Sequence, residues 1–324
     1  MFRTPVEITP PIHHIALHQP LLLVGSCFTE AMGERFQRNK FEVRVNPFGT
    51  LYNPVSLFRL LDDAVCQTMP ADDTYLVNQD IHFNYQFHSD FSGDSRVGLQ
   101  TQIEQTLSNT RQYLKDCQWL ILTLGSAFAY ERLDNGQLVS NCHKMPAQLF
   151  RKRLFNTEEI ITQFDRLEQI LQAWNPEIQY IFTVSPVRHL RDTLIQNSLS
   201  KSVLRWVVHT LQQKYPDNIY YFPSYEIMMD ELRDYRFYRD DMLHPSEMAE
   251  DYIWQTFVEN CLDAKSQNFL KTWKPLYQAL QHRAFRPTSE AHQQFLRKTI
   301  SRLKQLSQQI DVTAEIQELE RQII

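Results

Sequence analysis

The chain has 324 residues, of which 43% are hydrophobic and 12% aromatic, so it can bury a sizeable core. Its formal net charge of −5 and the lack of a basic stretch interleaved with aromatic residues argue against nucleic acid as a partner. The five cysteines form no CxxC pair and are odd in number, which argues against a disulfide framework. The apolar run at 20–24 is too short for a signal-peptide core or a membrane span, so we expect a cytoplasmic protein without a membrane partner.

Apolar segments rich in strand-forming residues alternate with segments of helical periodicity. The expected strands are 20–24, 41–45, 118–124, 178–184 and 218–222. The expected helices are 29–39, 54–66, 100–116, 157–174, 199–214 and 246–262. The strands lack strict polar alternation, which is typical of parallel strands buried on both faces. The pattern predicts a doubly wound α/β fold, in which ligands bind at the carboxyl ends of the strands.

Two segments interrupt this alternation, and the end of the chain departs from it. Residues 75–92 and 128–141 predict small antiparallel insertions, the second around the turn signal Asp134-Asn135-Gly136. We predict a main domain over 1–263 and a C-terminal helical extension over 264–324. An apolar stripe in the extension predicts a helix packed on the main domain; the alternative is a homodimer formed through the C-terminal helices. The stripe consists of Leu296, Ile300, Leu303, Leu306 and Ile310.

Polar residues that could carry chemistry lie near the predicted strand ends. Ser26 follows the first strand and opens a helix, a position where a serine is more often a cap. Asp241 and His244 lie three residues apart just before another helix. A serine becomes nucleophilic when an imidazole removes its proton, and a carboxylate that orients the imidazole completes a triad. We therefore predict Ser26 as nucleophile, His244 as base and Asp241, rather than Asp240, as the orienting carboxylate.

Two cysteines are alternative candidates for the nucleophile, and the histidines near the N-terminus raise the question of a metal site. On a helix the side chain of Cys27 would diverge by about 100° from that of Ser26, so we interpret Cys27 as a packing residue. Cys142-His143 is a second thiol candidate, although adjacent residues rarely form a nucleophile–base pair. Neither His13-His14 nor His18 has a nearby carboxylate or cysteine that would complete a ligand set. The sequence predicts no metal site and no organic cofactor.

Several segments resemble the bacterial GSCFA domain family over roughly residues 20–260. They are Gly-Ser-Cys-Phe at 25–28, Asn-Pro-Phe-Gly-Thr-Leu-Tyr-Asn-Pro at 46–54, Asn-Cys-His-Lys at 141–144, Val-Ser-Pro-Val at 184–187, Ser-Lys-Ser-Val-Leu-Arg at 200–205 and Tyr-Phe-Pro-Ser-Tyr-Glu at 221–226. That family is similar to the SGNH/GDSL hydrolases, with a flavodoxin-like three-layer sandwich around a parallel five-stranded sheet. The resemblance implies acyl-ester hydrolysis by Ser26, Asp241 and His244.

The resemblance also implies where an oxyanion would be held. The backbone N–H groups of Ser26 and Gly49 match two usual donors. SGNH enzymes usually present a Gly-x-Asn-Asp after the third strand, whereas residues 125–128 here are Gly-Ser-Ala-Phe, so that asparagine is absent. We predict that the amide of Asn141 substitutes for it. The alternative is that Asn141 is a turn residue bonded to its own backbone.

Three residues near the strand ends are candidates for substrate binding. His143, Lys144 and Arg188 could hold a polar or anionic group, or be ordinary loop residues. The sequence thus predicts a serine esterase acting on an O-acyl or acetyl group of a glycan or another polar small molecule. The alternatives are an acyltransferase and a non-catalytic member that binds a polar ligand at the same site.

Overall fold

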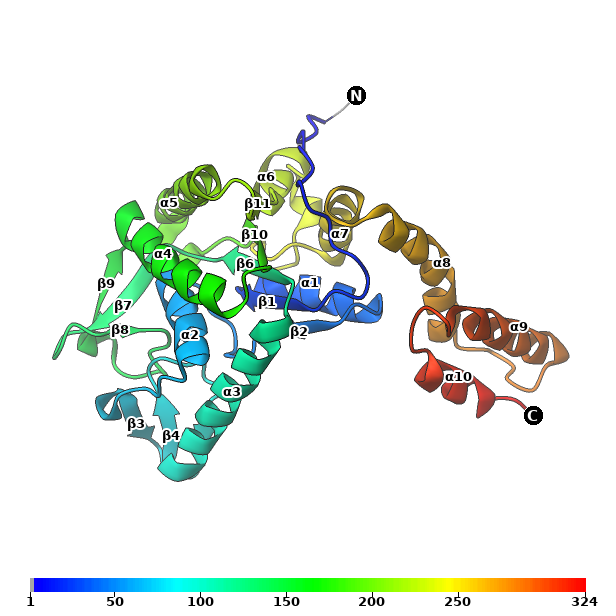
Figure 1. Cartoon of the computed structure of the whole chain (residues 1–324), viewed down its shortest axis with the longest axis horizontal. Helices are drawn as coiled ribbons and strands as arrows, with labels where there is room; N and C mark the ends of the chain where they lie inside the picture. The colour runs from blue at the N-terminus through cyan, green and yellow to red at the C-terminus, as the bar shows by residue number, and fades with distance from the viewer. Residues whose placement is uncertain (1–2) are drawn as a thin grey trace.

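The computed structural model describes residues 3–324, and its centre is a five-stranded sheet (Figure 1). All four strand pairings are parallel, in the order β11-β10-β6-β1-β2. Numbered along the chain, this is the 2-1-3-4-5 order of flavodoxin-like folds. The strands are β1 (Leu21–Gly25), β2 (Val43–Val45), β6 (Trp119–Leu124), β10 (Gln179–Val184) and β11 (Ile219–Tyr221). The predicted fold class is confirmed.

Helices cover both faces of the sheet, which makes three layers. Leu22 and Val24 of β1 share one apolar cluster with α2, α3, α4 and α5. Leu21 and Leu23 point to the opposite face, where α1 and α7 pack. The helices are α1 (Cys27–Arg38), α2 (Pro54–Cys66), α3 (Arg96–Asp116), α4 (Thr157–Trp174), α5 (Thr193–Lys214) and α7 (Glu247–Cys261). Short helical turns lie at Asp72–Thr74, Ala147–Leu149, Leu190–Asp192, Ser224–Glu226 (α6), Ile227–Glu231 and Tyr235–Phe237.

Two small antiparallel sheets interrupt the alternation, as the sequence predicted. The first has the order β3-β4-β5 and the second β8-β7-β9. The second insertion extends further than expected, because β9 pairs with β7 along its full length. The strands are β3 (Tyr75–Asn78), β4 (Ile81–Asn84), β5 (Ser92–Gly93), β7 (Phe128–Arg132), β8 (Leu138–Val139) and β9 (Phe150–Leu154).

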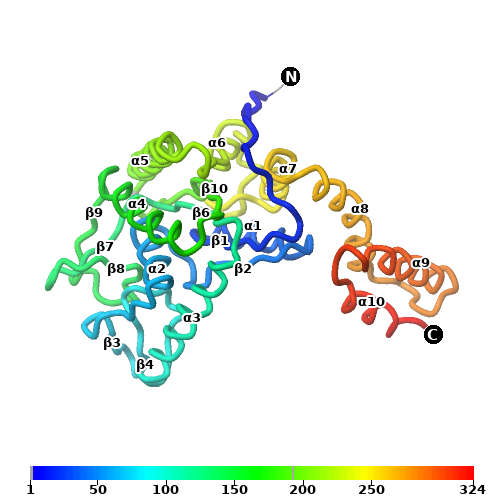
Figure 2. Tube along the Cα trace, in the orientation of Figure 1, coloured from blue at the N-terminus to red at the C-terminus, as the bar shows by residue number. Residues whose placement is uncertain are grey.

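The C-terminal helices lie beyond α7, at one end of the molecule (Figures 1 and 2). The predicted apolar stripe lies on α9, except for Ile310, which follows that helix, and it is buried within the chain, in the same cluster as residues of α1 and α7. The Trp273 indole donates to the carbonyl oxygen of Arg38 at 2.8 Å and ties α8 to α1. The helices are α8 (Ala264–Gln281), α9 (Glu290–Leu306) and α10 (Thr313–Glu320). We retain the domain boundary at 263/264 and the homodimer as proposals.

Within residues 3–324, no helix combines the length and the apolar character needed to cross a bilayer.

Candidate active site

The turn from β1 into α1 is built around Gly25. Its φ of +151° is a conformation that residues with a Cβ rarely adopt. Ser26 then forms the N-cap of α1, but its side chain makes no capping hydrogen bond. The serine is only 1% exposed, and its Oγ has no hydrogen-bond partner among the described residues. Its backbone N–H donates to the carbonyl oxygen of Thr123 at 3.2 Å.

Gly25→Ala is expected to destabilise the protein by about 3 kcal/mol or more. A Cβ at this position would overlap the backbone carbonyl oxygen of Thr123, in addition to the strain from the positive φ. Gly136→Ala is the matched control, because Gly136 also has a positive φ (+71°) but a Cβ added there would meet nothing within 4 Å. We expect it to cost about 1 kcal/mol. Urea denaturation measures the free energy of unfolding of both variants. Equal losses of stability would contradict a specific overlap with the Thr123 carbonyl oxygen.

The loop after β2 closes over this turn. The side-chain carbonyl of Asn46 accepts a hydrogen bond from the Gly25 N–H at 2.9 Å, and its Nδ2 donates to Glu30 of α1 at 3.3 Å. Thr50 also donates to Glu30, at 2.6 Å. The N–H of Gly49 donates to the carbonyl oxygen of Asn46 at 2.9 Å. Two predicted oxyanion donors, the N–H groups of Ser26 and Gly49, are therefore engaged with backbone carbonyls.

Asp241 and His244 form a close pair. His244 Nδ1 lies 2.6 Å from Asp241 Oδ2, while Asp241 Oδ1 accepts from the N–H groups of His244 (3.0 Å) and Leu243 (2.8 Å). These two backbone donors and the imidazole lower the pKa of Asp241 to about 2. The carboxylate therefore stays ionised at neutral pH and fixes the ring through Nδ1. His244 Nε2 is left as the nitrogen available to move a proton.

His244 lines a cavity of about 230 Å³ together with the first turns of α1. Its walls come from α1, from the loop after β10, from the loop that carries His244 and from α7. The lining residues are Cys27, Phe28, Glu30, Ala31, Glu34, Val187, Arg239, His244, Pro245 and Glu250. Cys27, rather than Ser26, contributes to this cavity. The predicted hydrogen bond between Ser26 and His244 is not formed, because Ser26 Oγ has no partner within the described chain.

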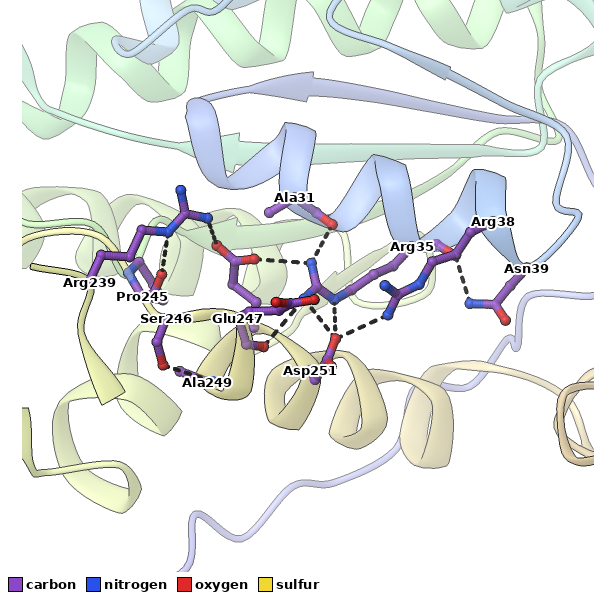
Figure 3. A network of polar contacts seen from close by, with 11 residues as sticks. Ala31, Arg35, Arg38, Asn39, Arg239, Pro245, Ser246, Glu247, Ala249 and Asp251 are labelled. Carbon is purple, nitrogen blue, oxygen red and sulfur yellow. Dashed lines mark hydrogen bonds and ion pairs between the residues drawn. The ribbon is translucent and has the colours of Figure 1, made fainter. Parts of the chain in front are cut away.

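An ionic network holds the His244 loop against α1 (Figure 3). The Arg239 N–H donates to the carbonyl oxygen of His244 at 2.8 Å, and its Nε donates to that of Pro245 at 3.0 Å. The Arg239 guanidinium also pairs with Glu250 at 2.7 Å, and Glu250 pairs with Arg35 of α1 at 3.1 Å. Glu250 thus joins the His244 loop to α1, which forms the opposite wall of the cavity.

Glu250→Gln is expected to lower the free energy of unfolding by about 2 kcal/mol, because it removes the buried one of the two charge partners of the Arg35 guanidinium. The side chains of Arg35 and Glu250 are only 3% and 8% exposed. Asp251→Asn is the control, since Asp251 also pairs with Arg35 but is half exposed, and exposed pairs contribute little. Thermal melting of both variants measures the difference. A larger loss for Asp251→Asn would contradict this ranking.

Two of the predicted site residues, Asn141 and His143, make hydrogen bonds within the two insertions. The side-chain oxygen of Asn141 accepts a hydrogen bond from the His143 N–H at 2.8 Å, which is the turn geometry of the alternative interpretation. His143 is buried, with Nε2 2.7 Å from the Asn84 carbonyl oxygen and its ring 4.8 Å from that of Phe83. Burial lowers its pKa. The oxyanion role of Asn141 and the substrate role of His143 remain predictions.

The other two predicted binding residues differ in their surroundings. Lys144 is exposed and has a positive φ of 57°. Arg188 lies beside the His244 loop, because its N–H donates to the Leu243 carbonyl oxygen at 3.3 Å. Its guanidinium donates to the Tyr238 hydroxyl at 2.6 Å and stacks on that ring at 4.4 Å. Of the candidate binding residues, Arg188 is thus tied to the loop that carries His244.

Two basic residues, the buried Lys201 and the half-buried His189, lie near the strand ends, and Lys201 was not predicted as a site residue. Lys201 is fully buried, and its Nζ donates to the carbonyl oxygens of Gly125 (2.8 Å) and Ser185 (2.7 Å), which follow β6 and β10. Burial lowers its pKa to about 7. His189 Nε2 has no hydrogen-bond partner in the part of the chain described. Burial, followed by the charge of Lys201, lowers the His189 pKa to about 4, so its ring is neutral at physiological pH.

Lys201→Met is expected to change how stability depends on pH. Lysine in an unfolded chain titrates near 10.4, so between about pH 7 and 10 the unfolded state binds a proton that the folded state does not. The contribution of Lys201 to stability therefore falls as pH drops through this range, by up to about 1.4 kcal/mol per pH unit. The stability of wild type relative to Lys201→Met should rise between pH 7 and 9 in urea denaturation. The exposed control Lys115→Met should show a constant difference, and a constant difference for Lys201→Met would contradict the prediction.

Among the described residues, no group of three or more histidine, cysteine, aspartate or glutamate side chains is placed to hold a metal ion. All five cysteines are free thiols.

The chain is thus an α/β protein with a flavodoxin-like parallel sheet. An Asp–His pair lies at the cavity beside the start of α1. The GSCFA family model matches residues 20–257, and the model described as "GSCFA domain protein, C-terminal domain" matches residues 273–324. The chain belongs to the GSCFA family, as its sequence predicted. A comparison with curated proteins finds no match.

Solved structures with some likeness to this chain have low identity and low TM-scores. A putative platelet activating factor from Streptococcus pneumonia is 10% identical, with 76% of this chain and 86% of that chain covered and a TM-score of 0.38. A carbohydrate esterase family 2 enzyme from Corynascus thermopiles is 9% identical, with 82% and 69% covered and a TM-score of 0.41. An acetyl xylan esterase from Butyrivibrio proteoclasticus is 10% identical, with 76% and 64% covered and a TM-score of 0.39.

Proposed function

We propose that this chain hydrolyses acyl esters by double displacement at the β1–α1 turn, with His244 as base and Asp241 as the carboxylate that orients it. The observation that carries the proposal is the Asp241–His244 pair, 2.6 Å apart, beside a cavity that reaches the first turn of α1. A positioned imidazole with its second nitrogen fixed by a carboxylate is the arrangement that activates a hydroxyl or thiol. Ser26 is the nucleophile that the sequence predicts, and it has to leave its buried position to act.

The proposed substrate is a small acyl ester, such as an O-acetyl group on a glycan or another polar molecule. The cavity of about 230 Å³ suits a short acyl group. Arg188, which is tied to the His244 loop, and the exposed Lys144 are proposed to hold the polar part of the substrate. We also propose a cytoplasmic protein without nucleic-acid or membrane partners, in keeping with its free cysteines and negative charge.

One observation favours the alternative of a non-catalytic ligand-binding protein. Two predicted oxyanion donors, the N–H groups of Ser26 and Gly49, already bond carbonyl oxygens, and the third, Asn141, sits in a local turn. A missing oxyanion donor costs on the order of 10²–10³ in rate. The acyltransferase alternative would use the same residues but exclude water from the second step.

A screen of p-nitrophenyl esters of increasing acyl length, together with acetylated sugars, tests the proposal. We expect turnover that is greatest for short acyl groups and that requires His244. A fluorophosphonate probe adds an independent test, since a working nucleophile–imidazole pair is expected to react with it. Binding of acetylated sugars without turnover, and without probe labelling, would support the non-catalytic alternative.

A further inference from the structure

We propose that the nucleophile of this site is the thiol of Cys27, with His244 accepting its proton. The proposal rests on the proposed function and deepens it, because it names the group that attacks the ester. Three side chains carry it: Cys27 at the start of α1, and the His244–Asp241 pair across the cavity. A cysteine and a carboxylate-bound histidine that line one cavity are the groups that thiol catalysis requires.

Access distinguishes Cys27 from Ser26. Cys27 is partly exposed and lines the cavity that His244 also lines. Ser26 is one residue earlier, yet its Oγ is buried and does not contribute to that cavity. An attacking atom must approach the acyl carbon to about 3–3.5 Å. A substrate that enters beside His244 therefore reaches Cys27 without any change at the Gly25 turn.

The start of α1 supplies donors for negative charge on sulfur. Cys27 is the first residue of this twelve-residue helix, where backbone N–H groups lack helical acceptors. The N–H groups of Phe28 and Cys27 face the sulfur and lower its pKa, and Lys201 adds a smaller lowering when it is protonated. The same N–H groups are proposed to receive the oxyanion of an ester attacked by this sulfur, in place of the engaged donors.

Other contributions keep the resting thiol protonated. Burial, and then the charge of Glu30, raise the pKa of Cys27 above its ordinary value. A base is therefore required at neutral pH, and His244 is the imidazole that shares the cavity. The remaining charged groups that line it are Glu34 of α1, Glu250 of α7 and Arg239 of the His244 loop.

The reaction balances with water as the only co-reactant. His244 Nε2 takes the thiol proton while sulfur bonds to the acyl carbon and the carbonyl π pair moves to oxygen. Collapse of this intermediate breaks the ester C–O bond, and the alcohol leaves with the proton from the imidazolium. Water then loses a proton to His244 and attacks the thioester. The C–S bond breaks, sulfur recovers its proton and the carboxylic acid is released.

Alkylation of the wild-type protein tests the thiol–imidazole pair without any ester. Iodoacetamide modification is followed by mass spectrometry at Cys27, with the exposed thiol of Cys66 as the internal reference. We expect His244→Ala to slow alkylation of Cys27 about tenfold at pH 7 and to change its pH profile, with Cys66 unaffected. The proposal is overturned when the rate and the pH profile of Cys27 alkylation are the same in the wild-type protein and in His244→Ala.

Trapping the acyl-enzyme tests the attack itself. After rapid quench with p-nitrophenyl acetate, we expect the acetyl group on Cys27, as a thioester that neutral hydroxylamine removes, and no such adduct in His244→Ala. Cys27→Ala should lower turnover by about 10³ or more, and Cys66→Ser should leave it unchanged. Cys27→Ser, which nearly preserves side-chain size, provides a second variant should Cys27→Ala fail to fold. A Ser26 adduct, or full activity in Cys27→Ala, overturns the proposal while leaving the proposed function standing.

Failure of the proposed function would look different. If the wild-type protein turned over no ester and formed no adduct, ester hydrolysis would be wrong. The alkylation profiles would still decide on Cys27: dependence on His244 would support the thiol–imidazole pair, and independence would overturn it.

Discussion

Replacing His244 with alanine is expected to lower kcat/KM for ester hydrolysis by about 10³ or more. In the structure, Asp241 occupies Nδ1 of this ring, so Nε2 is the atom that can accept a proton from a nucleophile in the cavity. Without that acceptor, a serine would have to attack as the alcohol, and a cysteine would react only through the small fraction that is ionised. The His244 side chain is 39% exposed, so its removal should change the melting temperature little.

Two controls separate loss of the base from general damage. His209→Ala removes an exposed histidine of α5 and should leave turnover unchanged. Added imidazole should restore part of the activity of His244→Ala, since a free base can enter the space that the side chain vacates. Near-normal turnover in His244→Ala would contradict a role for His244 as the base, whichever side chain attacks.

The secondary structure could be predicted where local signals agree. Helix α2 spans the predicted residues 54–66 because Asn53 caps it through the Ser56 N–H, Pro54 suits its first position and Gln67 ends it in a left-handed conformation. Helix α4 likewise spans the predicted residues 157–174 and begins at a capping box formed by Asn156 and Glu159. In both helices the signals that set the bounds lie within a few residues of the ends.

Helical periodicity in the sequence begins at 29, whereas Ser26 was predicted to open the helix, and the structure places the start of α1 at 27. What sets it is not local: Gly25 is held by the side chain of Asn46, which comes from the loop after β2. This difference bears on the site, because the first turn of α1 determines that Cys27 lines the cavity and Ser26 does not. Helical periodicity gave the angle between the two side chains but not which of them faces the cavity.

Local sequence signals were also insufficient where other parts of the candidate site depend on contacts between distant residues. The Asp241–His244 pair was predictable, because both residues belong to one turn. Arg35 and Glu250 are 215 residues apart, and in a sequence each reads as a surface charge. Lys201 did leave a signal: it shares the buried face of α5 with Leu204 and Leu211, at helical spacing, so a charge falls where apolar residues are expected. A buried amine with two carbonyl acceptors resolves that conflict.

Asp241→Asn is expected to reduce ester hydrolysis by roughly 10²–10⁴ while preserving the turn that carries His244. The asparagine carbonyl can still accept the N–H groups of Leu243 and His244, as Asp241 Oδ1 does. Its NH₂ group would then face His244 Nδ1, which must become an acceptor, so the ring proton moves to Nε2. An imidazole that presents a proton to the nucleophile cannot remove one.

The acid side of the pH–rate profile offers a second check on Asp241. Because its pKa in the folded protein is about 2, its contribution to activity and stability is present above the ordinary range of aspartate and is lost only as the pH falls through about 2. Any loss of wild-type activity between pH 5 and 7 should therefore come from another group. Asp240→Asn is the matched control, since Asp240 is an exposed neighbour that lacks the hydrogen bond to His244. Equal losses in Asp240→Asn and Asp241→Asn would show that net negative charge, rather than the orientation of His244, is what the site requires.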